Sequence, residues 1–195
     1  MGKGQKTFKY VFIPADLSAS FEEMSMEQPE GQEVECLTTH LQNYFRQKSI
    51  PISDEDSKAM LRKSLQEQLP KGATVTDEML NVANSVQLVE SMPLLSGGPH
   101  SKFIHVNMYG DDRSQAKSLP VNERANKLSE ACGTPRHVLG DVFIGRIYED
   151  ADDFYRLDFT LSELDSGADW IKAALAHNTT KMSGAGQAQL KALQQ

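Results

Sequence analysis

Residues 8–13, Phe-Lys-Tyr-Val-Phe-Ile, are the stretch that indicates the fold class, and Pro14 follows them directly. In an extended chain successive side chains point to opposite sides, so the three aromatic residues face one way and Val11 and Ile13 face the other. Apolar side chains on both sides predict a buried strand. Pro14 has no amide hydrogen to donate to a neighbouring strand, so it ends this one.

Outward from this strand, two spacings of apolar residues follow one another along the chain. Alternation with period two predicts a weaker strand at 21–26 and clearer strands at 86–92, 103–109, 138–147 and 155–161. Helical spacing predicts helices at 32–47, 54–69 (with Ser53 as its cap), 122–132 and 169–177. Strands and helices are mixed irregularly. This pattern favours an α+β fold, a mostly antiparallel sheet with helices packed on one face.

The length of 195 residues suits a single domain. We expect this domain to span residues 1–177, with a helical insert at about 45–85, and a flexible polar tail to follow at 178–195. No apolar run approaches the roughly 18 residues of a membrane span. The first residues also lack the apolar core of a secretory signal. We therefore expect a cytoplasmic protein without membrane contact.

The charge balance and the cysteines narrow the function further. The chain has 20 basic and 27 acidic side chains, a formal charge of −7, which disfavours binding to nucleic acid. Cys36 and Cys132 are too few for a disulfide framework, so we expect two free thiols in a reducing compartment. Cys132 precedes His137 by five residues, yet it lies on the apolar face of a predicted helix. A buried, inert thiol is therefore expected rather than a nucleophile.

Four segments of the chain carry a resemblance to a known family. They are 13–16 (IPAD), the acidic turn at 111–112, 117–125 (KSLPVNERA) and 138–145 (VLGDVFIG). In this order they resemble a small domain family of unknown function from bacteria, phages and mobile elements, with longer relatives in algae or protists. Its members typically read IPAD, K-G-L-P-x-N-x-x-A and G-D-x-x-x-x-G, so Ser118 stands where the family usually has Gly. The resemblance covers roughly residues 8–147 and implies no catalytic residue, activity or cofactor.

The residues that match these motifs also have a structural explanation. Pro120 fixes the backbone before a helix, and the side chain of Asn122 can cap the first turn of that helix. Gly140 allows close backbone approach, and Asp141 can accept hydrogen bonds from turn amides. We therefore interpret the motifs as mainly structural, in segments that can converge at one end of the sheet.

Acidic residues gather between 149 and 169, where eight acids accompany a single base. Hard divalent cations take clustered oxygen ligands, so Glu149, Asp150, Asp152 and Asp153 are a candidate metal site. Their spacing lacks the Asp-x-Asp-x-Asp-Gly order and the distal Glu of a calcium loop. We favour the alternative, in which these residues form a solvated turn between two strands.

Taken together, the sequence favours a non-catalytic binding or accessory module that contacts a protein or a small ligand and uses no cofactor. The common nucleotide-binding and hydrolase signatures do not occur in it. The polar groups that we expect at the binding site are Tyr109, Asp111, Asp112, Asn122, Arg124 and Asp141. One alternative is a small metal-assisted hydrolase or transferase that uses the acidic residues at 149–153. Another is a scaffold or assembly subunit, including a homo-oligomer, with contacts on Trp170 and the last helix.

Overall fold

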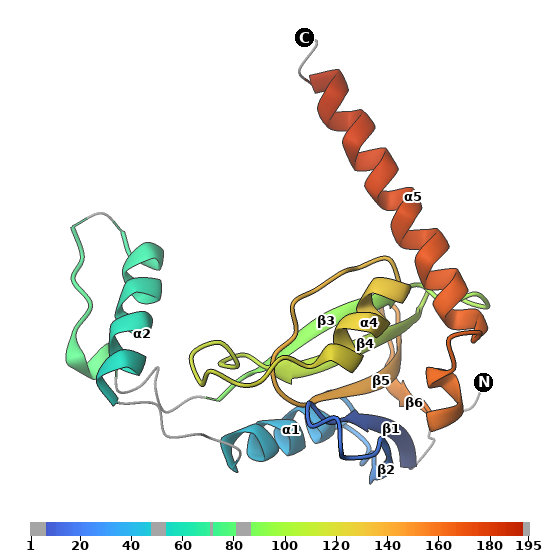
Figure 1. Ribbon diagram of the computed structural model, residues 1–195, viewed down its shortest axis with the longest axis horizontal. Coiled ribbons are helices and arrows are strands. Elements are labelled where there is room, and N and C mark those ends of the chain that lie inside the picture. The colour runs from blue at the N-terminus through green and yellow to red at the C-terminus, as the bar shows by residue number, and fades with distance from the viewer. Residues whose placement is uncertain (1–6, 48–53, 71, 81–86, 193–195) are drawn as a thin grey trace.

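The computed structural model describes residues 7–47, 54–70, 72–80 and 87–192, and its centre is an antiparallel sheet (Figure 1). The strands follow the order β2-β1-β5-β4-β3, and β6 pairs with β5. Their bounds are β1 (Thr7–Ile13), β2 (Glu22–Glu27), β3 (Val89–Ser96), β4 (Ile104–Asp111), β5 (Val142–Glu149) and β6 (Phe154–Leu157). All strand pairs are antiparallel, so the predicted α+β class is confirmed.

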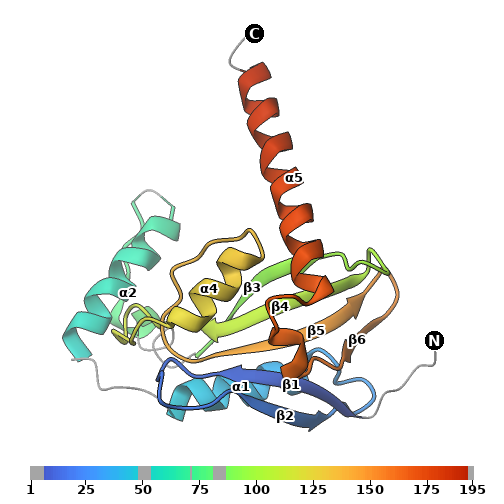
Figure 2. The ribbon, with the colours of Figure 1, turned by 45° about the vertical axis from the view of Figure 1, so that its right-hand side comes forward.

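Helices cover both faces of this sheet, whereas the sequence analysis placed them on one face. They are α1 (Glu35–Gln47), α2 (Asp54–Gln68), α4 (Glu123–Ala131) and α5 (Asp169–Ala192), with a 3₁₀ turn η1 (Leu161–Leu164). The aromatic side of β1 packs on α1, while Val11 and Ile13 join a core with α4 and α5. Figure 2 shows α4 and α5 above strands β3, β4 and β5, and α1 below these three strands. Because β1 is apolar on both sides, each side needs its own cover.

Several boundaries differ from the prediction for local reasons. β5 begins at Val142 instead of 138, because Gly140 turns the chain with a φ of 75°. β6 ends at Leu157, after which the amide of Phe159 donates to the carbonyl of Lys9 (2.9 Å). The predicted start of a strand at residue 86 and the predicted cap Ser53 lie outside the described residues.

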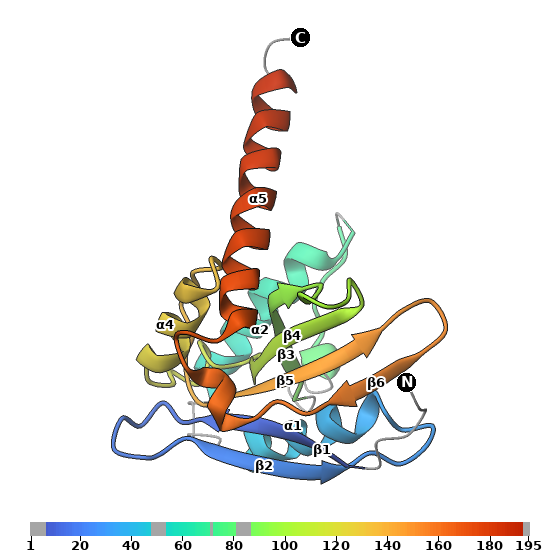
Figure 3. The same cartoon turned by 90° about the vertical axis from the view of Figure 1, so that its right-hand side faces the viewer.

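Two segments lie away from the centre of the sheet. The segment from 178, expected as a flexible tail, continues α5 as a helix to Ala192, and this helix projects away from the sheet (Figure 3). α2, in the expected helical insert, lies at the opposite end of the molecule from β6 (Figure 1). Among the described residues, no helix is long and apolar enough to cross a membrane.

Candidate ligand-binding site

The motif segments meet at one end of the sheet. An isolated bridge pairs Val121 with Leu139, and the amide of Gly140 donates to the carbonyl of Pro120 (2.7 Å). These contacts place residues 119–122, just before α4, alongside residues 138–141, just before β5. The last residues of β1 lie beside them, because Ile13 pairs with Val142. Three segments that are far apart in the sequence are therefore neighbours in space.

Asn122 joins these three segments. Its side-chain nitrogen donates to the carbonyls of Ile13 (3.0 Å) and Gly140 (2.9 Å), and its side-chain oxygen accepts from the amide of Ala125 (3.0 Å) in the first turn of α4. The residue is 0% exposed. The predicted helix cap is present, and the two additional hydrogen bonds make Asn122 a link between β1, α4 and the turn before β5.

Asp141 also holds the motif segments together, on the side of α1. One carboxylate oxygen accepts from the amide of Ala15 (2.9 Å) and the other from the hydroxyl of Tyr44 near the end of α1 (2.6 Å). Burial, together with the hydrogen bond to Asp141, raises the pKa of Tyr44 well above its usual range. The phenol therefore stays neutral and remains a donor. Asp141 is half-buried and connects the IPAD loop to α1.

Two backbone conformations explain further motif positions. Gly140 lies in the left-handed region, and a Cβ atom there would come within 2.6 Å of the Leu119 side chain. Ser118 also has a positive φ, 51°, in a region that glycine adopts without strain. Glycine would adopt this conformation at position 118 with less strain than serine.

A buried ion pair lies behind the motif segments. The ammonium of Lys117 donates to Asp111 (2.6 Å), to the side-chain oxygen of Gln87 (2.7 Å) and to the carbonyl of Phe45 (3.0 Å). Lys117 is 5% exposed and Asp111 is 1% exposed. Three acceptors satisfy all three ammonium donors. Sequence reasoning missed Lys117 and Gln87 as site residues, although Lys117 stands within the motif segment 117–125.

Of the remaining candidate residues, two form hydrogen bonds near the motif segments and one lies away from them. Arg124 donates to the carbonyls of Leu17 (2.5 Å) and Ala19 (2.7 Å), so it holds the loop after β1. Asp112 accepts from Gln87 (2.6 Å), and burial raises its pKa. Tyr109 packs in the core under α1, away from the junction, so the structure does not bring all six candidate residues together.

A concave cavity of about 390 Å³ opens where the motif segments meet, and we call it the motif pocket. It is lined by residues 14–16, 119–120 and 140–141, by Tyr44 and Phe45 of α1, and by Phe12, Ala19 and Asp111. Of the six candidate residues, Asp111 and Asp141 line this pocket, while Asn122 and Arg124 hold its walls from outside. Its volume is at the lower end of the roughly 300–1,000 Å³ of small-molecule sites.

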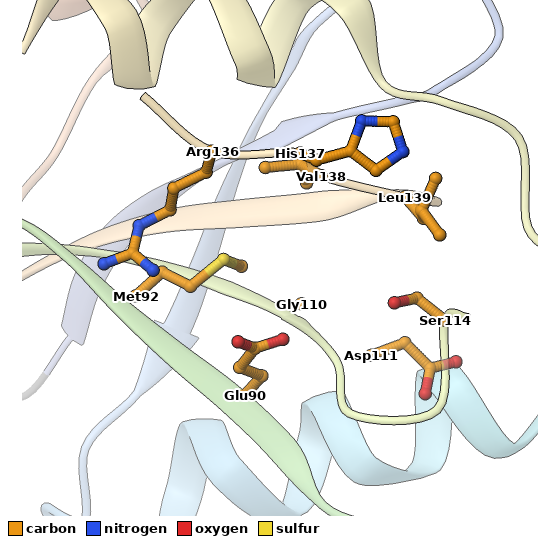
Figure 4. A pocket seen from close by; sticks show the side chains of 9 residues that line it. All are labelled: Glu90, Met92, Gly110, Asp111, Ser114, Arg136, His137, Val138 and Leu139. Atoms are coloured by element: carbon orange, nitrogen blue, oxygen red, sulfur yellow. The ribbon is translucent and has the colours of Figure 1, made fainter. Parts of the chain in front are cut away.

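A second cavity, of about 260 Å³, lies beside the edge strand β3, and we call it the edge pocket (Figure 4). Glu90 and Arg136 lie on opposite sides of it. Ser114 and His137 also line it, but no hydrogen bond joins them among the described residues, and the Asp111 carboxylate points away from both. These three residues therefore do not form a nucleophile, base and acid relay.

The acidic residues at 149–153 lie at the end of β5 and in the turn that leads to β6, as favoured from the sequence. Asp150 accepts from the amides of Asp152 (3.0 Å) and Asp153 (2.8 Å) and from the hydroxyl of Tyr148 (2.5 Å). The hydrogen bond from Tyr148, followed by those from the two amides, lowers the pKa of Asp150. In the described part of the chain, no group of three or more His, Cys, Asp or Glu residues could hold a metal ion. We therefore derive no metal-assisted reaction from Glu149, Asp150, Asp152 and Asp153.

Two other predictions concern Cys132 and Trp170. Both cysteines are free thiols, and Cys132 is fully buried; burial raises its pKa to about 12. The expected burial of Cys132 is thus confirmed, and its inertness stays a prediction. Trp170, expected at an assembly contact, is only 5% exposed and donates to the carbonyl of Glu163 (2.6 Å) inside the core. It cannot form that contact without unpacking.

No protein-family model, curated protein or solved structure matches this chain. The resemblance to the bacterial and phage domain family therefore stays a prediction.

Proposed function

We propose that this protein is a non-catalytic module that binds a small ligand in the motif pocket. The observation that carries the proposal is the convergence of three separated motif segments on one cavity of about 390 Å³. Their polar side chains fix the walls by hydrogen bonds within the protein. A pre-formed cavity with apolar walls and few polar groups is the usual form of a small-molecule site.

The non-catalytic part of the proposal is supported by what surrounds the pocket. The ammonium of Lys117 is fully bonded and buried, so it cannot reach a ligand without breaking an ion pair. The thiol of Cys132 is buried in the core under α4 and α5, with its pKa raised by that burial. Asp141 accepts two hydrogen bonds from the protein and is placed to orient a ligand.

A pocket-filling substitution tests this function. Ala19 is half-buried and is one of the residues that line the motif pocket. We expect Ala19→Phe to fill the cavity while leaving Asn122 and Asp141 in place. Fragments that bind the native protein, detected by saturation-transfer NMR on the ligands, should lose their signal with this variant. The matched control is Arg136→Ala, which removes a wall of the edge pocket and should leave binding unchanged.

Two results of this experiment would contradict the proposal. Fragment signals that survive in Ala19→Phe but vanish in Arg136→Ala would assign binding to the edge pocket. A library of several hundred fragments that gives no signal with the native protein would remove the proposed function altogether. Melting curves for both variants establish that each is folded before the comparison is made.

We also propose that the protein works in the cytoplasm. Two free cysteines, one of them half-buried at the start of α1, suit a reducing compartment.

The scaffold alternative keeps one supporting observation, the continuation of α5 past the sheet to Ala192 (Figure 3). Light scattering over a range of concentrations tests it, because an assembly through α5 would lose mass on dilution and a strict monomer would not.

A further inference from the structure

Among the described residues that line the motif pocket, the charged ones are all acidic. They are Asp16, Asp111 and Asp141, and this part of the lining includes no lysine, arginine or histidine. Lys117 neutralises Asp111 through the buried ion pair. The hydrogen bonds from Ser18 lower the pKa of Asp16, so this carboxylate is ionised at neutral pH. Arg124, which donates to the carbonyl of the lining residue Ala19, also lowers the pKa of Asp16 through its charge. The negative field that the pocket presents to a ligand therefore centres on Asp141.

The carboxylate of Asp141 can accept further hydrogen bonds from a ligand. A carboxylate offers about four lone-pair positions, and the protein occupies two of them, through the amide of Ala15 and the hydroxyl of Tyr44. Among the described residues, no lysine, arginine or histidine nitrogen lies within 4.0 Å of Asp141. A half-buried carboxylate without a counter-ion favours a positively charged partner.

Aromatic rings form the apolar part of the same pocket. Phe12, Tyr44 and Phe45 line it, with the Phe12 and Tyr44 ring centres 5.8 Å apart and the Tyr44 and Phe45 centres 5.5 Å apart, both pairs in T-shaped contact. The faces of aromatic rings attract cations, and alkylammonium groups combine this attraction with an apolar surface. Aromatic rings beside a carboxylate suit such a group better than they suit a neutral or an anionic one.

We propose that the motif pocket selects ligands with an organic ammonium group on a small apolar body. The ammonium group would lie against Asp141, and the apolar body would contact Phe12 and Tyr44. This inference rests on the proposed function, since it names the ligand class for the same cavity. An inorganic divalent cation fits less well, because the described residues provide no group of three ligands that could hold one.

A charge series of matched ligands tests the selectivity. Benzylammonium, benzyl alcohol and benzoate share one aromatic body and differ in charge by one step each. Choline and 3,3-dimethylbutan-1-ol form a second pair with an aliphatic body. We expect each cation to bind the full-length protein at least about tenfold more tightly than its neutral partner, and benzoate to bind most weakly, because ionised hydrogen bonds are roughly twice as strong as neutral ones. Raising the ionic strength should reduce the advantage of the cations.

Asp141→Asn removes the charge and keeps the shape. The amide oxygen of the asparagine can still accept from Ala15, and its nitrogen can donate to the oxygen of Tyr44. In this variant we expect the advantage of the cation over its neutral partner to disappear, so that the two affinities become about equal. Native-like melting of the variant is the control. Should it fail to fold, the charge series and the salt dependence on the native protein still decide the matter.

The outcomes separate this inference from the function on which it rests. Neutral ligands that bind as tightly as cations, and are blocked by Ala19→Phe, would overturn the inference and leave the proposed function standing. A cation preference that persists in Asp141→Asn would also overturn it. Pocket ligands found only among anions or neutral fragments would do the same. The absence of any pocket ligand in the fragment library would overturn both.

Discussion

Replacement of Asn122 by alanine should destabilise the protein far more than the loss of a helix cap does. The cap alone contributes about 1 kcal/mol. Asn122 is 0% exposed and also donates to the carbonyls of Ile13 and Gly140. A buried carbonyl left without its donor costs about 1–3 kcal/mol. We therefore expect Asn122→Ala to lower the free energy of unfolding by about 3–7 kcal/mol.

Urea denaturation followed by tryptophan fluorescence measures this loss, because Trp170 lies in the core that contacts α4. Asn122→Ser is the matched variant: its hydroxyl can still cap α4, but it is too short to reach both carbonyls. It should be about 1 kcal/mol more stable than Asn122→Ala. An alanine variant within about 0.5 kcal/mol of the native protein would refute the reasoning, since Asn122 would then not hold the pocket walls.

Three further predictions address neighbouring features. Ser118→Gly should raise the free energy of unfolding by up to about 1 kcal/mol in urea denaturation, because it relieves a left-handed backbone, and a loss of stability would contradict that explanation. Lys117→Met should cost about 3–5 kcal/mol in the same assay by leaving Asp111 buried and unpaired, and adding Asp111→Asn should recover part of it; a neutral single variant would speak against the buried pair. Iodoacetamide at pH 7.5 should label half-buried Cys36 in the folded protein and leave Cys132 unlabelled until unfolding, and rapid labelling of Cys132 would show that it is accessible.

The sheet could be predicted from the sequence because its signal is local. Alternation at 8–13 indicates β1, and the same alternation shows that both faces of this strand need a cover, although we expected helices on only one. The start of α4 can also be predicted from the sequence, because the Asn122 side chain caps the amide of a residue only three positions later. The apolar pattern gives no sign of the left-handed turn at Gly140, so it predicts a start of β5 four residues too early.

The pocket could be predicted only in part. The motif segments predict that Asp111, Asn122 and Asp141 lie close together, and these residues do lie at or behind the pocket. Tyr44 and Lys117 were missed as site residues, because their roles depend on contacts with residues 97 and 6 positions away that no local spacing encodes. The sequence around Lys117 does not indicate that this lysine is buried. Its burial becomes evident only when the position of Asp111 in the fold is known.

The central claim, a ligand site built by the motif segments, is tested most directly by mapping amide chemical shifts of the ¹⁵N-labelled protein during titration with benzylammonium. The account predicts that the largest changes fall on the amides of Ala15, Asp16, Gly140 and Asp141, and that they disappear in Ala19→Phe. Changes confined to residues around Arg136 and His137, or the same changes in Ala19→Phe as in the native protein, would contradict it.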